Sequence, residues 1–580
     1  MRDLLETSIL AAVVGAVTGF IAIGVRLAIA FVTGIAFRND VELTFLSPMA
    51  NGLGLWVIVV PAVGAIVAYV IVRFVANDER IRGSGEIVRS VAMRRGRVSR
   101  RKMVGHAAAT IVSVGSGGSA GREGAMVQLA AATSMLASLF SGASVRRRKV
   151  LIAAGGGAAI AATFNTPIAG VIFAMEVVLI EWSTRAFVPL VVASAMGTLV
   201  ASKYLGDQPA FLIPQYDLIS SRELLLYILL GILAGLLAIG LSRLTRSSDK
   251  LFSSLPGPEW LRHVWGGLLV GLIGFAVPAV FGVGYETVHE VLQGNMLLYA
   301  LVAILLAKLL AYAITRGASG SSGAFSPTFF LGSALGGLFG LLVHSAFPTW
   351  TATPGAYALV GMACMYAAVT RASLTAVVML YEMTHTFSIV IPVMLAVVVA
   401  DALAKSYGAP SYFRQTQERE LQGDASVNIL DIVNVGEIMS SPAETVAAED
   451  PIRRVVEKRF ATGHQGYPVV DAEGRLVGIL TSTDLRQKVT DADLDKPVRD
   501  FMTSEPGTVT PHTSAHEALT EMVRLDVGHL PVVDERDTRK LVGFLTRSDL
   551  LRVKKRVAEE EQLTPAELDP RRLKHWPREK

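Results

Sequence analysis

A glycine-rich loop carries an arginine and a glutamate into the start of an apolar segment. The stretch "GSGGSAGREGAMVQL", residues 115–129, places Arg122 and Glu123 directly before that segment. The first turn of a helix exposes backbone N–H groups and about half a positive charge, so it binds anions. Glycine lets an ion approach the backbone closely. We predict that the Glu123 carboxylate competes with a mobile anion for this place, the structural alternative being an ion pair with Arg122.

A second glycine-containing helix start follows about 200 residues later, within a weak internal repeat. "GREGA" at 121–125 matches "GAFSP" at 323–327 in style, and "FNTPIAGVIFAMEVV" resembles "TRASLTAVVMLYEMT". This second match aligns Glu176 with Glu382 at the ends of apolar helices, where we expect structural roles rather than ion handling. Paired repeats with broken helices are typical of transporters that build a site at the bilayer midplane.

The elements that carry these motifs are apolar and often short. The chain has 580 residues, of which 52% are hydrophobic and 18% charged. Several of its apolar runs fall short of the ~20 residues that span a bilayer, and broken helices are tolerated there only around a buried site or cavity. Residues 1–425 are therefore predicted to form an all-α polytopic membrane domain with an inverted repeat, its first long helix near residues 8–34 being retained.

Charge separates the two parts of the chain. Residues 1–425 carry a net charge of +9 and residues 426–580 a net charge of −4. The basic clusters at 94–102 and 146–149 are typical of cytoplasmic loops, so the basic balance indicates membrane topology and not nucleic-acid binding. Cys364 is the only cysteine, which excludes an intrachain disulfide. The residues show no nucleophile–His–acid arrangement, metal cluster or P-loop, and we expect neither an enzyme nor a required cofactor.

The last quarter of the chain contains a clear tandem repeat. Equivalent positions include Met439 and Met502, which are followed in each unit by "YPVVD" or "LPVVD" and by "LVGIL" or "LVGFL". Amphipathic helices alternating with β-branched runs indicate a small α/β module. The repeat resembles a pair of CBS domains, at 435–490 and 497–555, before a charged tail at 556–580.

The CBS resemblance implies a candidate nucleotide site. Thr481 and Asp484 in "LTSTDL" recur as Thr546 and Asp549 in "LTRSDL". In nucleotide-binding CBS pairs this Asp accepts from the ribose hydroxyls and this Thr donates to a phosphate. The same residues can instead cap the helix that follows, and both interpretations stay open for an adenine nucleotide. His464 and His529, at equivalent places, are interpreted as structural and not as metal ligands; no metal site is predicted.

Several motifs of the membrane part together resemble the CLC family of chloride channels and proton-coupled chloride transporters. They are "GREGA", "FNTPIAGVIFAME", "GAFSP" and "PSY" at 410–412, in the family order. The resemblance implies a homodimer with one anion pathway per subunit, gated by Glu123. It further implies that the anion meets Arg122, the amides of Gly124, Ala125, Ala324 and Phe325, the hydroxyl of Tyr412 (with Tyr407 as its competitor) and the hydroxyl of Ser84.

Three departures from the family pattern bear on function. The family's "GSGIP" reads "GSGEI" after Ser84, and "GREGP" reads "GREGA", which returns an N–H to Ala125. The inner glutamate of proton-coupled members is replaced by Val177, which cannot carry a proton. Glu181, one turn further along the expected helix, is a weaker candidate for that role. Asp401, within an apolar run, receives no assignment.

These observations predict chloride or small-anion conduction across the inner membrane, with the CBS pair in the cytoplasm. The loss of the inner acid favours channel-like conduction, and proton–chloride exchange by another proton route is the alternative. A CBS-regulated divalent-cation transporter is a further alternative, but it would need clustered acidic residues among the membrane helices. A CBS-regulated receptor or enzyme without ion flux is the third.

Overall fold

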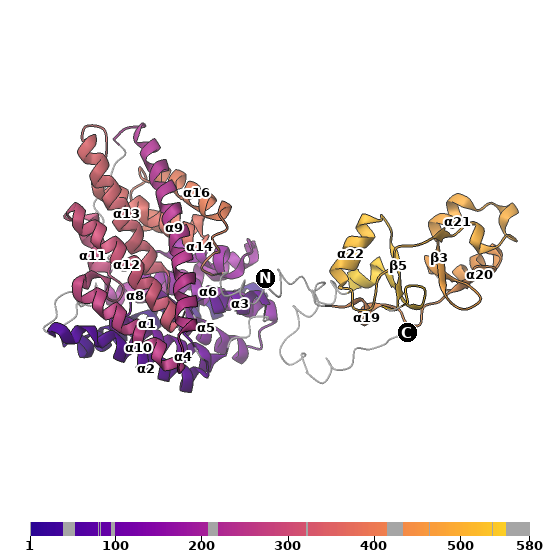
Figure 1. The fold of residues 1–580 in the computed structure, drawn as a ribbon, viewed down its shortest axis with the longest axis horizontal. Helices are drawn as coiled ribbons and strands as arrows, with labels where there is room; N and C mark the ends of the chain where they lie inside the picture. The colour runs from indigo at the N-terminus through magenta and orange to yellow at the C-terminus, as the bar shows by residue number, and fades with distance from the viewer. Residues whose placement is uncertain are drawn as a thin grey trace. The chain divides into compact units, whose positions relative to one another are not determined.

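The computed structural model describes residues 2–38, 53–78, 80–81, 83–93, 99–206, 219–320, 323–413, 433–462, 464–535 and 537–552. These residues divide into a unit within 1–420 and a smaller unit within 421–563. The larger unit is helical throughout its described elements, and the smaller one contains all the described strands. Figure 1 shows both units.

The larger unit has two halves with the same order of elements. Its first half contains α1 (Arg2–Phe37), η1 (Gly54–Ile58), α2 (Val60–Ile71), η2 (Val72–Ala76), α3 (Gly85–Met93), α4 (Arg100–Gly115), α5 (Glu123–Phe140), α6 (Val145–Phe164), α7 (Pro167–Phe173), η3 (Ala174–Leu179) and α8 (Thr184–Leu205). Its second half contains α9 (Glu223–Ser254), α10 (Glu259–Ala276), η4 (Pro278–Val280), α11 (Tyr285–Leu292), α12 (Leu298–Ser319), α13 (Phe325–Ala346), α14 (Pro354–Thr370), α15 (Ser373–Thr384) and α16 (Val390–Ser406).

Helices break at equivalent places in the two halves. The apolar run at 150–181 forms three elements, because Asn165 takes a left-handed conformation after α6 and Pro167 begins α7. Arg371 takes the same conformation after α14, directly before α15. A proline is tolerated in the first turn of a helix, where its missing N–H costs nothing. The expectation of broken helices in a repeat is therefore met in the backbone.

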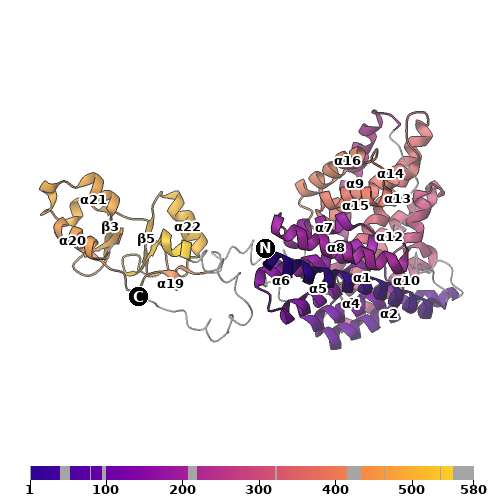
Figure 2. The same cartoon turned by 180° about the vertical axis from the view of Figure 1, so that it is seen from behind.

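The helical unit buries small residues between helices and exposes large apolar ones. Helix α1 packs against α4, α5, α6 and α8, which lie around it in Figure 2. Large side chains such as Phe31, Leu225 and Tyr299 are exposed, as expected for a surface that contacts lipid. Six described helices are long and apolar enough to cross a membrane.

The smaller unit is built from two similar α/β halves. The first contains α19 (Val435–Ile438), β1 (Val446–Ala447), α20 (Ile452–Thr462), β2 (Gly466–Val470), β3 (Leu476–Thr481), α21 (Ser482–Lys488), η5 (Asp491–Asp493) and η6 (Val498–Asp500). The second contains β4 (Thr503–Ser504), α22 (Ala515–Arg524), β5 (His529–Val533) and β6 (Leu541–Thr546). Strand β1 runs parallel to β2, whereas β2–β3, β3–β4 and β5–β6 are antiparallel.

The two halves of this unit exchange their leading segments. Strand β4, which follows Met502 at the start of the second repeat, pairs with β3 of the first. Ser440, which follows Met439 at the start of the first repeat, bridges to Phe544 in β6 of the second. The repeats are therefore completed by each other and form one unit.

Candidate anion pathway

The two matching glycine-rich loops pair directly with one another. The Gly121 N–H donates to the Gly323 carbonyl at 3.0 Å, in an antiparallel bridge. A Cβ on Gly323 would lie 2.6 Å from the Gly121 carbonyl oxygen, so this close approach requires glycine. The bridge places the first turns of α5 and α13 beside each other, from opposite halves of the repeat.

Glu123 lies docked at the start of α13. Its side chain is fully buried, and its Oε1 accepts hydrogen bonds from the Tyr285 hydroxyl, at 2.9 Å, and from the Ser326 hydroxyl. The two hydroxyl oxygens are themselves 2.9 Å apart. Ser326 is the second residue of α13, so the carboxylate occupies the end of that helix where a negative charge is stabilised.

Arg122 does not pair with Glu123 in this arrangement. The guanidinium carbon lies 5.0 Å from the centre of the Tyr285 ring, and the side chain is 1% exposed. Its Nε and Nη1 atoms have no hydrogen-bond partner among the described residues. The structural alternative considered for Glu123, an ion pair with its neighbour, is therefore not the one formed.

The helix-start amides differ in part from expectation. The Ala125 N–H donates to the Arg122 carbonyl at 3.1 Å, so this amide, expected to face the anion, is engaged within its own turn. Gly124 lies against the Gly323 backbone, 3.6 Å from where its own Cβ would be. In α13, the Ala324 carbonyl accepts from the Thr328 N–H at 3.1 Å, which begins the helix at Phe325.

An aromatic cluster surrounds Phe325, and Tyr412 lies one ring beyond it. Tyr412 is buried and packs against Phe413 with ring centres 5.1 Å apart. Phe413 in turn contacts Phe325 at 6.2 Å, and Tyr366 lies closer at 4.9 Å. Tyr407, the competitor of Tyr412, is 63% exposed. The buried tyrosine of the pair is thus Tyr412, although the rings that contact Phe325 are those of Phe164, Phe173, Tyr366 and Phe413.

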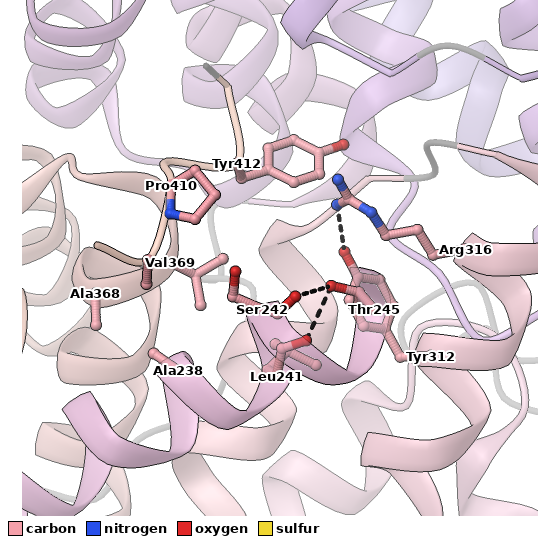
Figure 3. Close-up of a pocket in the computed structure, with 11 residues that line it drawn as sticks. Ala238, Leu241, Ser242, Thr245, Tyr312, Arg316, Ala368, Val369, Pro410 and Tyr412 are labelled. Carbon is pink, nitrogen blue, oxygen red and sulfur yellow. Dashed lines mark hydrogen bonds between the residues drawn. The ribbon is translucent and has the colours of Figure 1, made fainter. Parts of the chain in front are cut away.

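Tyr412 also lines a small cavity that is lined by the cationic side chain of Arg316 as well. The Arg316 guanidinium lies 5.0 Å from the Tyr412 ring centre, and its Nη1 donates to the Tyr312 hydroxyl at 3.5 Å. Figure 3 shows this guanidinium between the two tyrosines, with the side chains of Ser242 and Thr245 on the neighbouring helix. The cavity therefore combines one positive charge with hydroxyl groups.

Ser84 occupies the turn that begins α3 and is buried. The segment before it is held by a bridge from Ile81 to Gly320, with the Ile81 N–H donating to the Ser319 carbonyl at 3.1 Å. Gly320 and Gly323 are three positions apart, so the Ser84 segment and the Glu123 loop bridge to nearby points of the chain. Helix α3 also packs against η3, which carries Val177.

Val177 and Glu181 lie in different environments. Val177 is buried in η3, as an apolar residue at the expected place of an acid. The expectation that Glu181 continues this helix by one turn is wrong, because Ile180 takes a left-handed conformation and ends it. Glu181 is instead largely exposed, 4.0 Å from the Arg146 guanidinium. It lies outside the helix that would have directed it inward.

Glu176 and Glu382 act at helix ends. Glu382 accepts from the N–H groups of Ile168 and Ala169 at 2.8 and 2.6 Å, in the first turn of α7. Glu176 accepts from the N–H groups of Leu374 and Thr375 at 3.1 and 2.8 Å, in the first turn of α15. Both contacts agree with the structural role expected for these carboxylates.

Asp401, which the sequence left unassigned, forms an ion pair. Its Oδ1 accepts from the Arg371 Nη1 at 2.9 Å, and the same guanidinium donates to the Ala409 carbonyl at 2.6 Å. Arg371 thereby fastens the end of α16 and the segment that leads to Tyr412 to the α14–α15 turn.

The CBS threonine and aspartate pairs form caps in both halves. The Asp484 Oδ2 accepts from the Thr481 N–H and hydroxyl at 3.0 and 2.6 Å, and the Asp549 Oδ2 accepts likewise from Thr546 at 2.9 and 2.7 Å. The other oxygen of Asp484 is 2.7 Å from the Lys488 ammonium, whereas that of Asp549 is 3.6 Å from Arg552. The capping interpretation is realised in both halves. The second carboxylate oxygen of Asp549 lies farther from its cationic neighbour than that of Asp484 does.

The two histidines of the CBS repeat have different surroundings. His464 is exposed and lies 3.7 Å from the Glu444 carboxylate. His529 stacks on Phe544 with ring centres 5.7 Å apart, and burial, with the nearby Arg547 charge, lowers its pKa below the usual value. Among the described residues no group of three or more His, Cys, Asp or Glu could hold a metal ion.

Two residues that hold Glu123 were missed from the sequence. Tyr285 begins α11, a short helix that falls between the long apolar runs. Ser326 lies within "GAFSP", but only backbone amides were considered there. The glycines at 282 and 284, directly before Tyr285, repeat the pattern of glycines before a helix start and are the signal that could have found it.

Family models and known proteins match both units. A model described as voltage gated chloride channel matches residues 63–405, and a CBS domain model matches 435–491 and 498–556. A putative chloride channel protein ClcB-like of Ralstonia nicotianae is 33% identical over 375 residues, covering 64% of this chain and 87% of that protein. The H(+)/Cl(-) exchange transporter ClcA of Vibrio parahaemolyticus is 27% identical over 432 residues, covering 72% and 90%.

Solved structures share the fold. A slow cyanobacterial Cl-/H+ antiporter superposes with a TM-score of 0.65 at 22% identity, covering 72% of this chain and 98% of the other. A eukaryotic CLC transporter superposes with a TM-score of 0.62 at 20% identity, covering 94% and 98%. With the sequence matches, these show that the chain belongs to the voltage gated chloride channel (CLC) family and is a multi-pass membrane protein with a CBS pair.

Proposed function

We propose that this protein conducts chloride or a similar small anion along a pathway gated by Glu123. The supporting observation is the docking of the Glu123 carboxylate on the Tyr285 and Ser326 hydroxyls at the first turn of α13. Hydroxyl groups and a helix N-terminus can equally receive a halide. A carboxylate in that position therefore excludes the anion, and its protonation or displacement frees the same donors for it.

Channel-like conduction is the transport mode that we propose. A proton-coupled mechanism needs a second group to carry the proton, and Val177 cannot do so. Glu181 lies off the helix and largely exposed, which reduces its value as a substitute. The matched proteins include proteins named channels and a protein named an exchange transporter, so proton–chloride exchange by another route is the alternative.

The assembly that we propose is a homodimer in the inner membrane, with one pathway in each subunit and the CBS pair in the cytoplasm. Ser84, Arg122, Tyr412 and the helix-start amides of Gly124, Ala324 and Phe325 would line each pathway. The Ala125 N–H would join them only after leaving the Arg122 carbonyl. An adenine nucleotide bound between the CBS repeats would then act as a regulatory ligand, not as a required cofactor.

The test is anion flux from proteoliposomes with Glu123→Gln, which removes the charge and keeps the side-chain shape. We expect the pH dependence of flux to disappear while the variant remains folded. Glu290→Gln, on an exposed position of α11, is the matched control and should retain the wild-type profile. Unchanged flux and pH dependence in Glu123→Gln would refute the gate.

A proton electrode in the same vesicles separates the two transport modes. With channel-like conduction, an imposed chloride gradient drives no steady uphill movement of protons. Steady uphill movement would instead establish exchange, and its loss in Glu181→Gln would identify the proton route.

A further inference from the structure

A lysine lies fully buried in the middle of a membrane helix. Lys308 is 0% exposed, and it belongs to α12, which is long and apolar enough to cross a membrane. Neither the family motifs nor the proposed gate includes this residue. An ionisable side chain inside a membrane segment is costly and usually serves a function.

The Lys308 side chain binds one short loop. Its Nζ donates to the carbonyl oxygens of Val280 and Gly282, at 3.0 and 2.9 Å. These partners are backbone dipoles and carry no net charge, so the two hydrogen bonds hold the loop in place and do not form an ion pair. The loop needs such a hold in one conformation, because Gly282 takes a positive φ of 58°.

The loop leads directly to the tyrosine that holds Glu123. Gly284, with a φ of 79°, is the residue before α11, and Tyr285 is the first residue of that helix. Tyr285 is three positions after Gly282. Such a short piece of chain has little reach, so the place of the Gly282 carbonyl limits where the Tyr285 ring can lie.

The same lysine contacts α13 through an aromatic ring. The Lys308 Nζ lies 4.9 Å from the centre of the Phe330 ring. A Cβ on Gly284 would lie 2.6 Å from that ring, so Phe330 packs against the loop as well. Ser326 precedes Phe330 by about one turn of α13. Lys308 and Phe330 therefore join the loop before Tyr285 to the helix that carries Ser326.

We propose that Lys308 is a positioning residue for the gate, a role that rests on the proposed function of Glu123. The Tyr285 and Ser326 hydroxyls lie 2.9 Å apart, and both donate to one oxygen of the Glu123 carboxylate. Two donors from different helices can meet at one oxygen only while the helices keep a fixed relative position. By tying the loop to α13, Lys308 sets how firmly the carboxylate is docked and how often it is released.

The test is a double-mutant cycle, with anion flux per folded protein measured in proteoliposomes at neutral pH. Lys308→Met removes both hydrogen bonds and keeps an unbranched side chain, and we expect it to raise flux about three-fold or more. In the Tyr285→Phe background the same change should alter flux by less than about 1.5-fold, because residues that act through one contact are not additive. Lys250→Met, at an exposed position of α9, is the matched control and should behave as wild type.

Two further measurements separate positioning from a general loss of stability. Lys308→Gln keeps N–H donors, so flux should return part of the way to the wild-type value; this variant also carries the cycle if Lys308→Met does not fold. Hydrogen exchange of peptides covering residues 280–292 should be faster in Lys308→Met than in wild type, whereas exchange of the α9 peptides should be unchanged.

The positioning role is overturned if Lys308→Met lowers flux, changes it by the same factor in both backgrounds, or leaves both flux and exchange as in wild type. If Glu123→Gln leaves flux unchanged while Lys308→Met still speeds the exchange of residues 280–292, the proposed gate fails and the hold of Lys308 on the Tyr285 loop stands. If Glu123→Gln alters flux while Lys308→Met changes neither flux nor exchange, the gate stands and this inference alone fails.

Discussion

Glu176 and Glu382 cap each other's repeat. The carboxylate that follows α7 binds the first turn of α15, and the carboxylate near the end of α15 binds the first turn of α7. Each helix thus begins on a negative charge supplied by the opposite half, which satisfies N–H groups that have no partner within their own helix. The two halves are locked together by this exchange, close to the η3 segment that carries Val177.

Replacing Glu382 by alanine should destabilise the protein without ending anion flux. The change leaves two N–H groups of α7 unsatisfied, and the cost is expected near the upper end of measured N-cap losses, about 2 kcal/mol. Glu382→Gln, which keeps one acceptor, should cost about half as much. The thermal unfolding midpoint in detergent measures the loss, and flux per folded protein measures function.

Glu181→Ala is the matched control for the capping carboxylates, because Glu181 is an exposed glutamate in the same region. Its effect should stay within about 0.5 kcal/mol, as for surface substitutions in general. If Glu382→Ala is no more costly than Glu181→Ala, the exchanged caps do not hold the two halves together. If flux per folded protein is abolished, Glu382 handles ions after all.

Tyr285→Phe should open the gate. The substitution removes one of the two hydroxyls that hold Glu123 but keeps the ring beneath Arg122. A hydrogen bond to a charged group contributes about 1.5–3 kcal/mol, so the docked carboxylate should be released about ten-fold more often. Anion flux at neutral pH is expected to rise several-fold in proteoliposomes, with Tyr299→Phe, an exposed tyrosine, as the control. A fall in flux would mean that the hydroxyl serves the anion more than the gate.

The arrangement of helices was largely predictable, since long apolar runs and helix-breaking glycines mark the elements directly. The end of η3 was not, because Ile180 adopts a left-handed conformation that a β-branched residue rarely takes. The wrong position of Glu181 follows from that single residue. Tertiary packing imposes such a turn, and the residues around Ile180 show no local sequence pattern that predicts it.

The candidate site was predictable only where the charge lies in the motif itself. Glu123 stands out as a carboxylate in an apolar segment, and the matched glycines pointed to two helix starts. Their direct pairing through Gly121 and Gly323, and the hydroxyl of Tyr285, depend on contacts between residues 162 or more positions apart.

The affinity of the CBS pair for an adenine nucleotide should depend on Asp549 more than on Asp484. Both carboxylates cap a helix, but the second oxygen of Asp484 is held by Lys488 while that of Asp549 is only loosely approached by Arg552. Titration calorimetry of the full-length protein with AMP and ATP should show at least ten-fold weaker binding for Asp549→Ala, the loss of about one charged hydrogen bond. Equal losses in Asp484→Ala and Asp549→Ala would contradict this asymmetry.

The second CBS repeat should lose stability in mild acid because of His529. Burial beside Phe544 and the nearby Arg547 charge lower the pKa of His529 in the folded protein. The Asp549 charge acts in the opposite direction, but its effect is smaller. The unfolded chain, with an ordinary pKa near ~6.5, therefore binds more protons as the pH falls below that value, and stability is lost through the folded pKa. Hydrogen exchange of the β5–β6 peptides in the full chain, corrected for intrinsic rates, should show less protection at pH ~5.5 than at pH ~7.5. His529→Phe, which keeps a ring against Phe544, should abolish that difference in protection. Replacing the exposed His512 by phenylalanine is the control and should leave the difference intact. If His529→Phe shows the same loss of protection in acid, another group causes that loss.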